Sequence, residues 1–198
     1  MNPKTTAVVL IEYQNDFTSP GGTLHEAVKP VMDSTKMLPN TLDLVKRARE
    51  KGIAIIYAPI TFTPDYHELG ANPYGILANV VARKSFRKGT WGAAMVDSLT
   101  PQDSDIVIEG KRGLCAFAST NLDFILRSRG FSTIALGGFL TNCCVESTMR
   151  TGYEKGYDVI TLTDCTATVS AEEQKLAVEK NYPMFSKPMT HDAFLAGL

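Results

Sequence analysis

The sequence has few of the features that mark a secreted, metal-binding or nucleic-acid-binding protein. Its 198 residues include only four cysteines, three histidines and one tryptophan. The cysteines do not have the spacing of a zinc site, because Cys143 and Cys144 are adjacent and the other two are isolated. No apolar run is long enough to span a bilayer, and the formal net charge of −1 does not suggest a surface for nucleic acid or anionic membranes. We therefore expect neither a nucleic-acid nor a membrane partner.

The length suits one domain covering residues 1–198, with enough chain to bury a sizeable core. The N-terminal residues lead straight into an apolar segment without the pattern of a signal peptide. We therefore expect a cytoplasmic protein, in which the cysteines remain thiols.

Apolar strand-like runs alternate with amphipathic helical segments along the chain. This alternation predicts an open parallel sheet with helices on both faces. The predicted strands are residues 6–11, 53–58, 105–109, 133–136, 157–162 and a short one at 184–186. The predicted helices are residues 38–51, about 120–130, 146–157, about 170–180 and the tail after 189.

Residues 59–104 form an irregular connection, broken by prolines and glycines. Such a long connection is often a binding loop or lid. If the connection is a binding loop or lid, its aromatic side chains line a pocket. On the alternative interpretation they pack over the sheet or against a second subunit.

Three chemically active side chains each follow one of the predicted strands. Glu12 ends the first strand, Lys111 follows the third, and Cys144 follows the strand at 133–136. Because the carboxyl ends of parallel strands meet at one edge of the sheet, we expect these side chains to converge there. A carboxylate at the end of a central strand is costly to bury without a partner. The alternative interpretation of Glu12 is that it caps a loop or pairs with an arginine.

Cys144 falls in the predicted first turn of a helix, with Thr141 or Asn142 as the cap. The helix N-terminus and a nearby Lys111 ammonium lower a thiol pKa, and Glu12 is placed to accept the thiol proton. Backbone N–H groups near Leu140 and Cys144 are candidates for an oxyanion hole. The alternative interpretation of Cys144 alone is a plain buried cysteine.

The three histidines lie in predicted loops or in the tail, and we interpret them as surface residues: His25, His67 and His191. The candidate substrate-pocket residues, besides Leu140, are aromatic: Tyr13, Phe17, Tyr74, Trp91 and Phe117. They suggest a small, partly apolar or planar ligand.

Three motifs resemble those of the isochorismatase-like cysteine hydrolases, and the match covers nearly the whole chain. The motifs are residues 10–17, residues 109–112 with Phe117 shortly after, and residues 138–146. Each is weak alone, but their order and spacing together are specific. The resemblance implies a three-layer α/β/α fold with a six-stranded parallel sheet. It also implies a homodimer or homotetramer.

The resemblance further implies a catalytic triad of Glu12, Lys111 and Cys144, with a cis peptide just before Leu140 that turns backbone donors toward the oxyanion. One residue departs from the pattern, because the family usually has aspartate where this chain has Glu12. The extra methylene moves the carboxylate by about 1.5 Å, which is enough to matter in a triad.

The nicotinamidase branch of the family holds zinc with an aspartate and two histidines after the second strand. Residues 59–67 contain one aspartate and one histidine, out of that pattern. We therefore expect no catalytic metal and no cofactor. A retained cysteine and lysine favour hydrolysis of an amide or carbamoyl C–N bond in a small molecule, through a covalent thioester.

Two other functions stay open from the sequence. The first is hydrolysis of an isochorismate-type vinyl ether, which needs no thiol, with Glu12 as general acid. The second is a non-catalytic binding protein that has kept the fold. The glycines at 137–138 do not match a G-x-G-x-x-G dinucleotide-binding motif.

Overall fold

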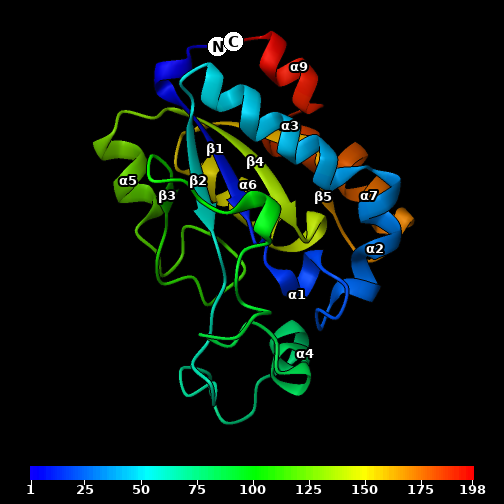
Figure 1. Cartoon of the computed structure of the whole chain (residues 1–198). Coiled ribbons are helices and arrows are strands. Elements are labelled where there is room, and N and C mark those ends of the chain that lie inside the picture. Colours follow the sequence, from blue (N-terminus) through cyan, green and yellow to red (C-terminus); the bar gives the residue numbers. More distant parts are fainter.

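The computed structural model describes residues 1–198 and contains one six-stranded parallel sheet (Figure 1). Its strand order is β3-β2-β1-β4-β5-β6, and every neighbouring pair is parallel. The strands are β1 (Thr6–Ile11), β2 (Ala54–Ala58), β3 (Ile106–Val107), β4 (Thr133–Phe139), β5 (Asp158–Ala167) and β6 (Lys187–Met189). The predicted α/β fold with a six-stranded parallel sheet is confirmed.

The two strands that carry Glu12 and Cys144 at their ends lie side by side in the middle of the sheet. Every residue of β1 and of β4 is buried. Strands with both faces covered need apolar residues at successive positions, and both sequences supply them. The register pairs Leu10 with Gly137 and Ile11 with Gly138, so the carboxyl ends of the two strands coincide.

Helices cover both faces of the sheet. The α-helices are α1 (Asn15–Thr18), α2 (His25–Ser34), α3 (Met37–Glu50), α4 (Gly75–Arg83), α5 (Leu122–Ser128), α6 (Glu146–Glu154), α7 (Ala171–Leu176), α8 (Tyr182–Phe185) and α9 (His191–Ala196). The shorter turns are 3₁₀ at η1 (Pro3–Thr5) and η2 (Asp97–Leu99), and π-helical at η3 (Thr141–Val145) and η4 (Ala177–Asn181). Residues of α2, α3 and α9 pack on one face, and residues of α5, α6 and α8 pack on the other. No helix combines the length and the apolar character needed to cross a membrane.

Several element boundaries differ from the sequence-based expectations. Strand β5 continues past residue 162 to Ala167, through a register irregularity opposite Leu136 and Gly138. The predicted strand at 184–186 is wrong, because helix α8 runs to Phe185 with Pro183 in its first turn, and β6 begins at Lys187. Pro183 was therefore a signal for the start of a helix, because the fixed φ angle of proline matches the first turn of a helix. Helices α2 and α4 were not predicted.

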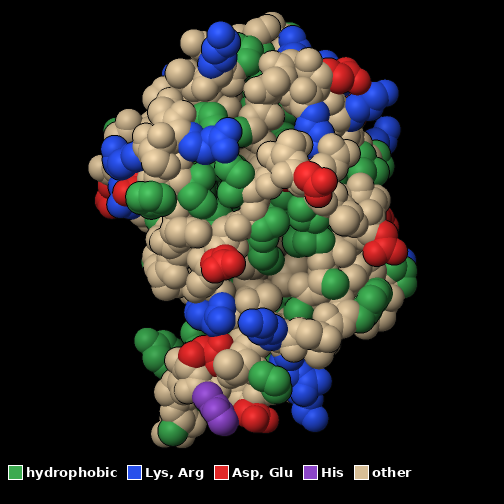
Figure 2. Space-filling view, turned by 60° about the vertical axis from the view of Figure 1, so that its left-hand side comes forward, with side chains coloured by type: hydrophobic (Ala, Val, Ile, Leu, Met, Phe, Trp, Pro, Cys, Tyr) green, Lys and Arg blue, Asp and Glu red, His purple; other side chains and the backbone are tan.

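The long connection at residues 59–104 forms a lobe beyond the carboxyl ends of the strands, and it contains helix α4 (Figure 1). In the space-filling view the lobe projects below the body and carries acidic, basic and hydrophobic side chains next to one another (Figure 2). The buried Gln14 amide bonds the backbone of Ile60 and Ala93. The buried Asp16 carboxylate accepts hydrogen bonds from Phe86 N, at 2.7 Å, and from Thr23. These two side chains fix the lobe to the strand end, and both carboxylate oxygens of Asp16 take part.

Gly138 allows β4 to approach β1 closely beside the candidate site. A Cβ atom at this position would lie 2.1 Å from the Ile11 carbonyl oxygen, and the backbone φ of +140° lies outside the range that side chains favour. The Ile11 oxygen belongs to the backbone of β1 and cannot move away without disrupting the strand. Glycine is therefore required here.

We expect Gly138→Ala to destabilise the protein by about 3 kcal/mol or more, because the clash combines overpacking with backbone strain. Urea unfolding followed by circular dichroism measures the change. Gly70→Ala is the matched control, since its added Cβ meets open space, and it should change stability by less than about 0.5 kcal/mol. Equal stability of the two variants would contradict the close-approach argument.

Candidate active site

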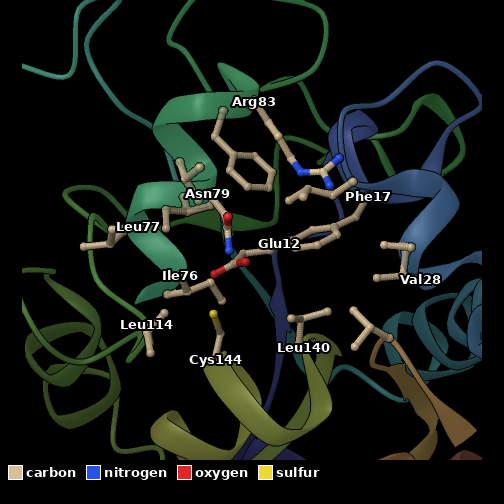
Figure 3. Close-up of a pocket in the computed structure, with 16 residues that line it drawn as sticks. Glu12, Phe17, Val28, Ile76, Leu77, Asn79, Arg83, Leu114, Leu140 and Cys144 are labelled. Carbon is tan, nitrogen blue, oxygen red and sulfur yellow. The ribbon is translucent and has the colours of Figure 1, made fainter. Parts of the chain in front are cut away.

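A cavity of about 290 Å³ opens at the carboxyl end of the sheet and brings Glu12 and Cys144 together. Figure 3 shows the Cys144 sulfur pointing into the cavity toward the Glu12 carboxylate. Most of the wall is apolar, contributed by the end of β1, by α1 and α2, by the α4 lobe and by the turn after β4. The cavity therefore offers a few polar groups within a largely apolar surface, as binding pockets for small molecules do.

Glu12 follows β1 directly and is only 2% exposed. Its backbone adopts the left-handed region at φ 61°, which a non-glycine residue rarely does. Such outliers occur where the surrounding structure holds a side chain in a required direction. The Glu12 carboxylate contacts the Lys111 ammonium group, which is fully buried and also donates to the Gly113 carbonyl oxygen at 2.9 Å.

Cys144 lies in the π-helical turn η3, between β4 and α6, and is 4% exposed. The expected side-chain cap is wrong, because residue Leu140 precedes the turn and the Thr141 hydroxyl instead donates to Gln174. The Phe139–Leu140 peptide bond is cis. The Leu140 N–H group makes no hydrogen bond within the protein, and the Leu140 residue lines the cavity.

One buried threonine joins the cysteine turn to the lysine loop. The Thr148 hydroxyl donates to the Cys144 carbonyl oxygen at 2.7 Å and accepts from Ala116 N at 2.9 Å. Both bonds are buried, so breaking them leaves polar groups unsatisfied. Thr148 therefore fixes the position of the Cys144 backbone relative to the loop that carries Lys111.

The charge environment of Cys144 differs from the sequence-based expectation. The neighbouring Cys143 thiol, burial and the Glu12 carboxylate together raise the pKa of Cys144 well above the ordinary thiol value. The Lys111 ammonium acts in the opposite direction but does not outweigh them. This direction is opposite to the lowered pKa expected from the sequence. The neighbouring Cys143 and burial are its two largest causes, and Glu12, which already pairs with Lys111, adds to them. Cys144 rests as a protonated thiol at neutral pH.

Lys111 remains a cation despite its burial. Burial alone lowers the pKa of Lys111, but the Glu12 carboxylate and the nearby cysteine sulfurs more than offset this, and the net shift is upward. Buried charges persist where a partner compensates the lost hydration. The pair therefore places a fixed, oriented carboxylate next to the Cys144 thiol.

Of the five aromatic pocket candidates, only Phe17 lines the cavity, where its ring stacks on Phe139 at 4.8 Å between centroids. Tyr13 points into the core, and its hydroxyl bonds Thr41 and the Cys165 carbonyl oxygen. The other three lie outside the cavity: Tyr74 and Trp91 are 89% and 55% exposed, and Phe117 packs on the opposite face of the sheet. Tyr13 and Phe17 lie four residues apart, but Tyr13 precedes helix α1, so helical spacing does not place them together.

The cavity wall that the sequence did not reveal comes mainly from helix α4. Its lining residues are Ile76, Leu77, Asn79, Val80 and Arg83, and Phe86 follows the helix. The apolar residues at 76, 77 and 80 follow helical spacing, which was a usable signal. The prolines and glycines around them hid it.

Two of the three histidines are buried, so their interpretation as surface residues is wrong. His25 hydrogen bonds the Phe17 carbonyl oxygen at 2.9 Å, and His191 hydrogen bonds Asp164 at 2.7 Å. Only His67 is exposed. His191 also belongs to the two side-chain groups whose geometry would suit a metal ion: Asp164, Cys165, His191, and Asp43, His191, Asp192. These groups lie between β5, α3 and α9, and none of them lines the cavity.

The comparisons with known proteins agree with this geometry. The model of the isochorismatase domain family matches residues 6–193. The chain belongs to the isochorismatase family. It is 34% identical to the ureidoacrylate amidohydrolase RutB of Methylobacterium radiotolerans, over 93% of this chain and 76% of that protein. It is also 34% identical to RutB of Azorhizobium caulinodans, over 91% of this chain and 84% of that one.

A solved structure of a cysteine hydrolase from Pseudomonas syringae pv. phaseolicola 1448A superimposes with a TM-score of 0.85. It is 27% identical in sequence and is matched over 99% of this chain and 93% of that chain. The family assignment and the parallel sheet therefore rest on independent sequence and structure comparisons. The chain is an isochorismatase-like hydrolase.

The raised pKa predicts how Cys144 reacts with iodoacetamide as pH changes. In the wild type, the midpoint for Cys144 should lie above the ordinary thiol value of about 8.5. Glu12→Gln should lower the midpoint, because it removes a negative charge that opposes thiolate formation. Lys111→Met should raise it, because the remaining carboxylate is then uncompensated.

Tandem mass spectrometry of the alkylated peptide distinguishes Cys144 from Cys143, whose pKa is lowered by the hydrogen bond from Cys144. Rapid labelling of wild-type Cys144 at pH 7 would contradict the account of a protonated resting thiol.

Proposed function

We propose that the protein hydrolyses a C–N bond in a small amide or carbamoyl compound, through a thioester on Cys144. The observation that carries this proposal is the shared cavity, in which the Cys144 sulfur faces a carboxylate that is held by Lys111. A thiol beside an oriented base is the arrangement that covalent acyl transfer requires.

In the first step, the sulfur of Cys144 bonds to the substrate carbonyl carbon while its proton passes to the Glu12 carboxylate. The electron pair of the carbonyl π bond moves to the oxygen. The Leu140 N–H group has no acceptor within the protein, and Leu140 is one of the lining residues of the cavity, so this N–H group is the candidate donor to the oxyanion. Proton transfer accompanies the attack, so the high pKa of the resting thiol is compatible with the step.

In the second step, the carbonyl re-forms, the C–N bond breaks, and the Glu12 carboxyl group gives its proton to the leaving nitrogen. An amine or ammonia departs, which leaves a thioester and an ionised Glu12. A water molecule then gives its proton to Glu12 and attacks the thioester carbon. The C–S bond breaks, and the Cys144 sulfur recovers the proton from Glu12.

Lys111 contributes to both half-reactions without exchanging a proton itself. Its ammonium holds the Glu12 carboxylate in place and compensates its charge each time the carboxylate re-forms. The mostly apolar wall limits water in the cavity, which strengthens these electrostatic interactions. The names of the curated relatives, ureidoacrylate amidohydrolases, support ureido compounds as the first substrates to screen.

Other expectations for this protein stay predictions. The family resemblance favours a homodimer or homotetramer, and exposed apolar side chains on α5, α6 and α8 support an assembly surface: Phe124, Tyr153 and Met184. The expected cytoplasmic location is likewise a prediction from the sequence.

The decisive variants are Cys144→Ala and Glu12→Gln, assayed on a panel of ureido and amide compounds. We expect Cys144→Ala to lower kcat/KM by about 10⁴-fold or more, because it removes the nucleophile. Glu12→Gln should lower kcat by about 10³-fold or more, because the amide cannot accept the thiol proton. Thermal unfolding of each variant controls for loss of the fold.

The same variants separate the alternatives that the sequence left open. A vinyl ether hydrolase would keep most of its activity after Cys144→Ala and would lose it after Glu12→Gln. A binding protein would turn over no member of the panel in its wild-type form. Either result would contradict the cysteine-dependent mechanism.

A further inference from the structure

Helix α4 places two polar side chains in a cavity wall that is otherwise apolar on this side. Asn79 and Arg83 line the cavity together with Glu12 and Cys144, and every other lining side chain is hydrophobic. The two residues are four apart on one helix, so they share a face. In Figure 3 the Asn79 amide points toward Glu12, while Arg83 lies at the end of the cavity away from Cys144, next to Phe17.

Arg83 retains most of its hydrogen-bonding capacity. Its single hydrogen bond within the protein goes from Nη1 to the Thr23 carbonyl oxygen at 3.2 Å, and no carboxylate pairs with it. A guanidinium group has five N–H donors in a planar fork that matches a carboxylate. The bond to Thr23 holds the side chain toward α2 and leaves the remaining donors for another acceptor.

The charges around the cavity are not balanced. Glu12 and Lys111 form a contacting pair whose charges compensate each other. Arg83 is therefore the one charged lining side chain without an oppositely charged partner in the protein, and its charge is positive. Phe17, Val80 and Phe86 contribute apolar surface to the wall of the same cavity. A ligand that fits this distribution has a neutral polar head, a short apolar spacer and an anionic tail.

We propose that Arg83 selects substrates that carry a carboxylate, by binding that group at the end of the cavity away from Cys144. The inference rests on the proposed function, because it places the scissile ureido or amide group of the same substrate near Glu12, Cys144 and Asn79. Arg83 is then a specificity residue. It touches the substrate far from the bond that breaks, so its loss affects binding of the anion more than the chemical step.

The test compares an acid with its neutral ester in binding to an inactive protein. The probes are 3-ureidopropionate and its methyl ester, titrated by calorimetry into the Cys144→Ala variant, which cannot turn them over by the proposed route. The second substitutions are Arg83→Met, Arg83→Lys and, as a matched control, Lys84→Met. Lys84 is the next residue and has the same charge, but it does not line the cavity.

We expect the acid to bind about 10-fold more tightly than the ester when Arg83 is present. Arg83→Met should weaken binding of the acid by about 10-fold and leave binding of the ester unchanged, while Arg83→Lys retains part of the preference. Lys84→Met should change neither affinity.

Three results would overturn the inference. They are equal affinity for acid and ester, equal weakening of both by Arg83→Met, and an absence of measurable binding of the acid. An equal effect of Lys84→Met would assign the preference to general surface charge and would also overturn it. Turnover by the wild-type protein is measured separately. If the protein binds the acid through Arg83 but hydrolyses no C–N compound, this result contradicts the proposed function and leaves the inference about Arg83 intact.

Discussion

The buried contact between Glu12 and Lys111 is the interaction on which the rest of the site depends. Glu12 is 2% exposed and Lys111 is fully buried, so neither charge has water to compensate it. Removing either partner from such a pair leaves an uncompensated buried charge, which typically costs about 3–5 kcal/mol. The pair therefore constrains where the end of β1 and the loop after β3 lie relative to each other, and Cys144 meets the carboxylate from the neighbouring strand β4.

This pairing contributes to the raised pKa of Cys144, together with the neighbouring Cys143 thiol and burial, which are its larger causes. A lone ammonium beside Cys144 would stabilise its thiolate. Here the Lys111 ammonium pairs with the Glu12 carboxylate, and that carboxylate raises the pKa of the facing thiol. In the proposed mechanism, the nucleophile is generated during the reaction by proton transfer to Glu12.

Glutamate at position 12 is the main departure from the aspartate that the family resemblance leads one to expect. The longer side chain still contacts Lys111 and still faces the cavity. Its backbone lies in the left-handed region, at φ 61°, and the Glu12 N–H group bonds the Ala58 carbonyl oxygen of β2 at 3.2 Å. The backbone at the end of β1 is thus fixed to β2.

The sequence predicted the parts of the structure that follow from apolar runs and from strand ends. The buried runs of β1 and β4 placed the sheet, and the polar residue after each strand placed Glu12, Lys111 and Cys144 at one edge. The sequence did not predict the cavity wall, because Tyr13 and Phe17 differ in direction only through the local turn at α1, and because α4 is hidden among prolines and glycines. The direction of the Cys144 pKa shift was likewise unpredictable, since it depends on the contact with Cys143, on burial and on the pairing of Glu12 with Lys111.

A trapped acyl-enzyme tests the central claim most directly. The wild-type protein is mixed with the ureido or amide compound that it turns over fastest, quenched in acid within milliseconds, and analysed by intact-protein and peptide mass spectrometry. The account predicts an adduct with the mass of the acyl group on Cys144, absent from Cys143 and released by hydroxylamine as a thioester should be. Turnover with no adduct on Cys144 at any time, together with a Cys144→Ala variant that remains active, would contradict it.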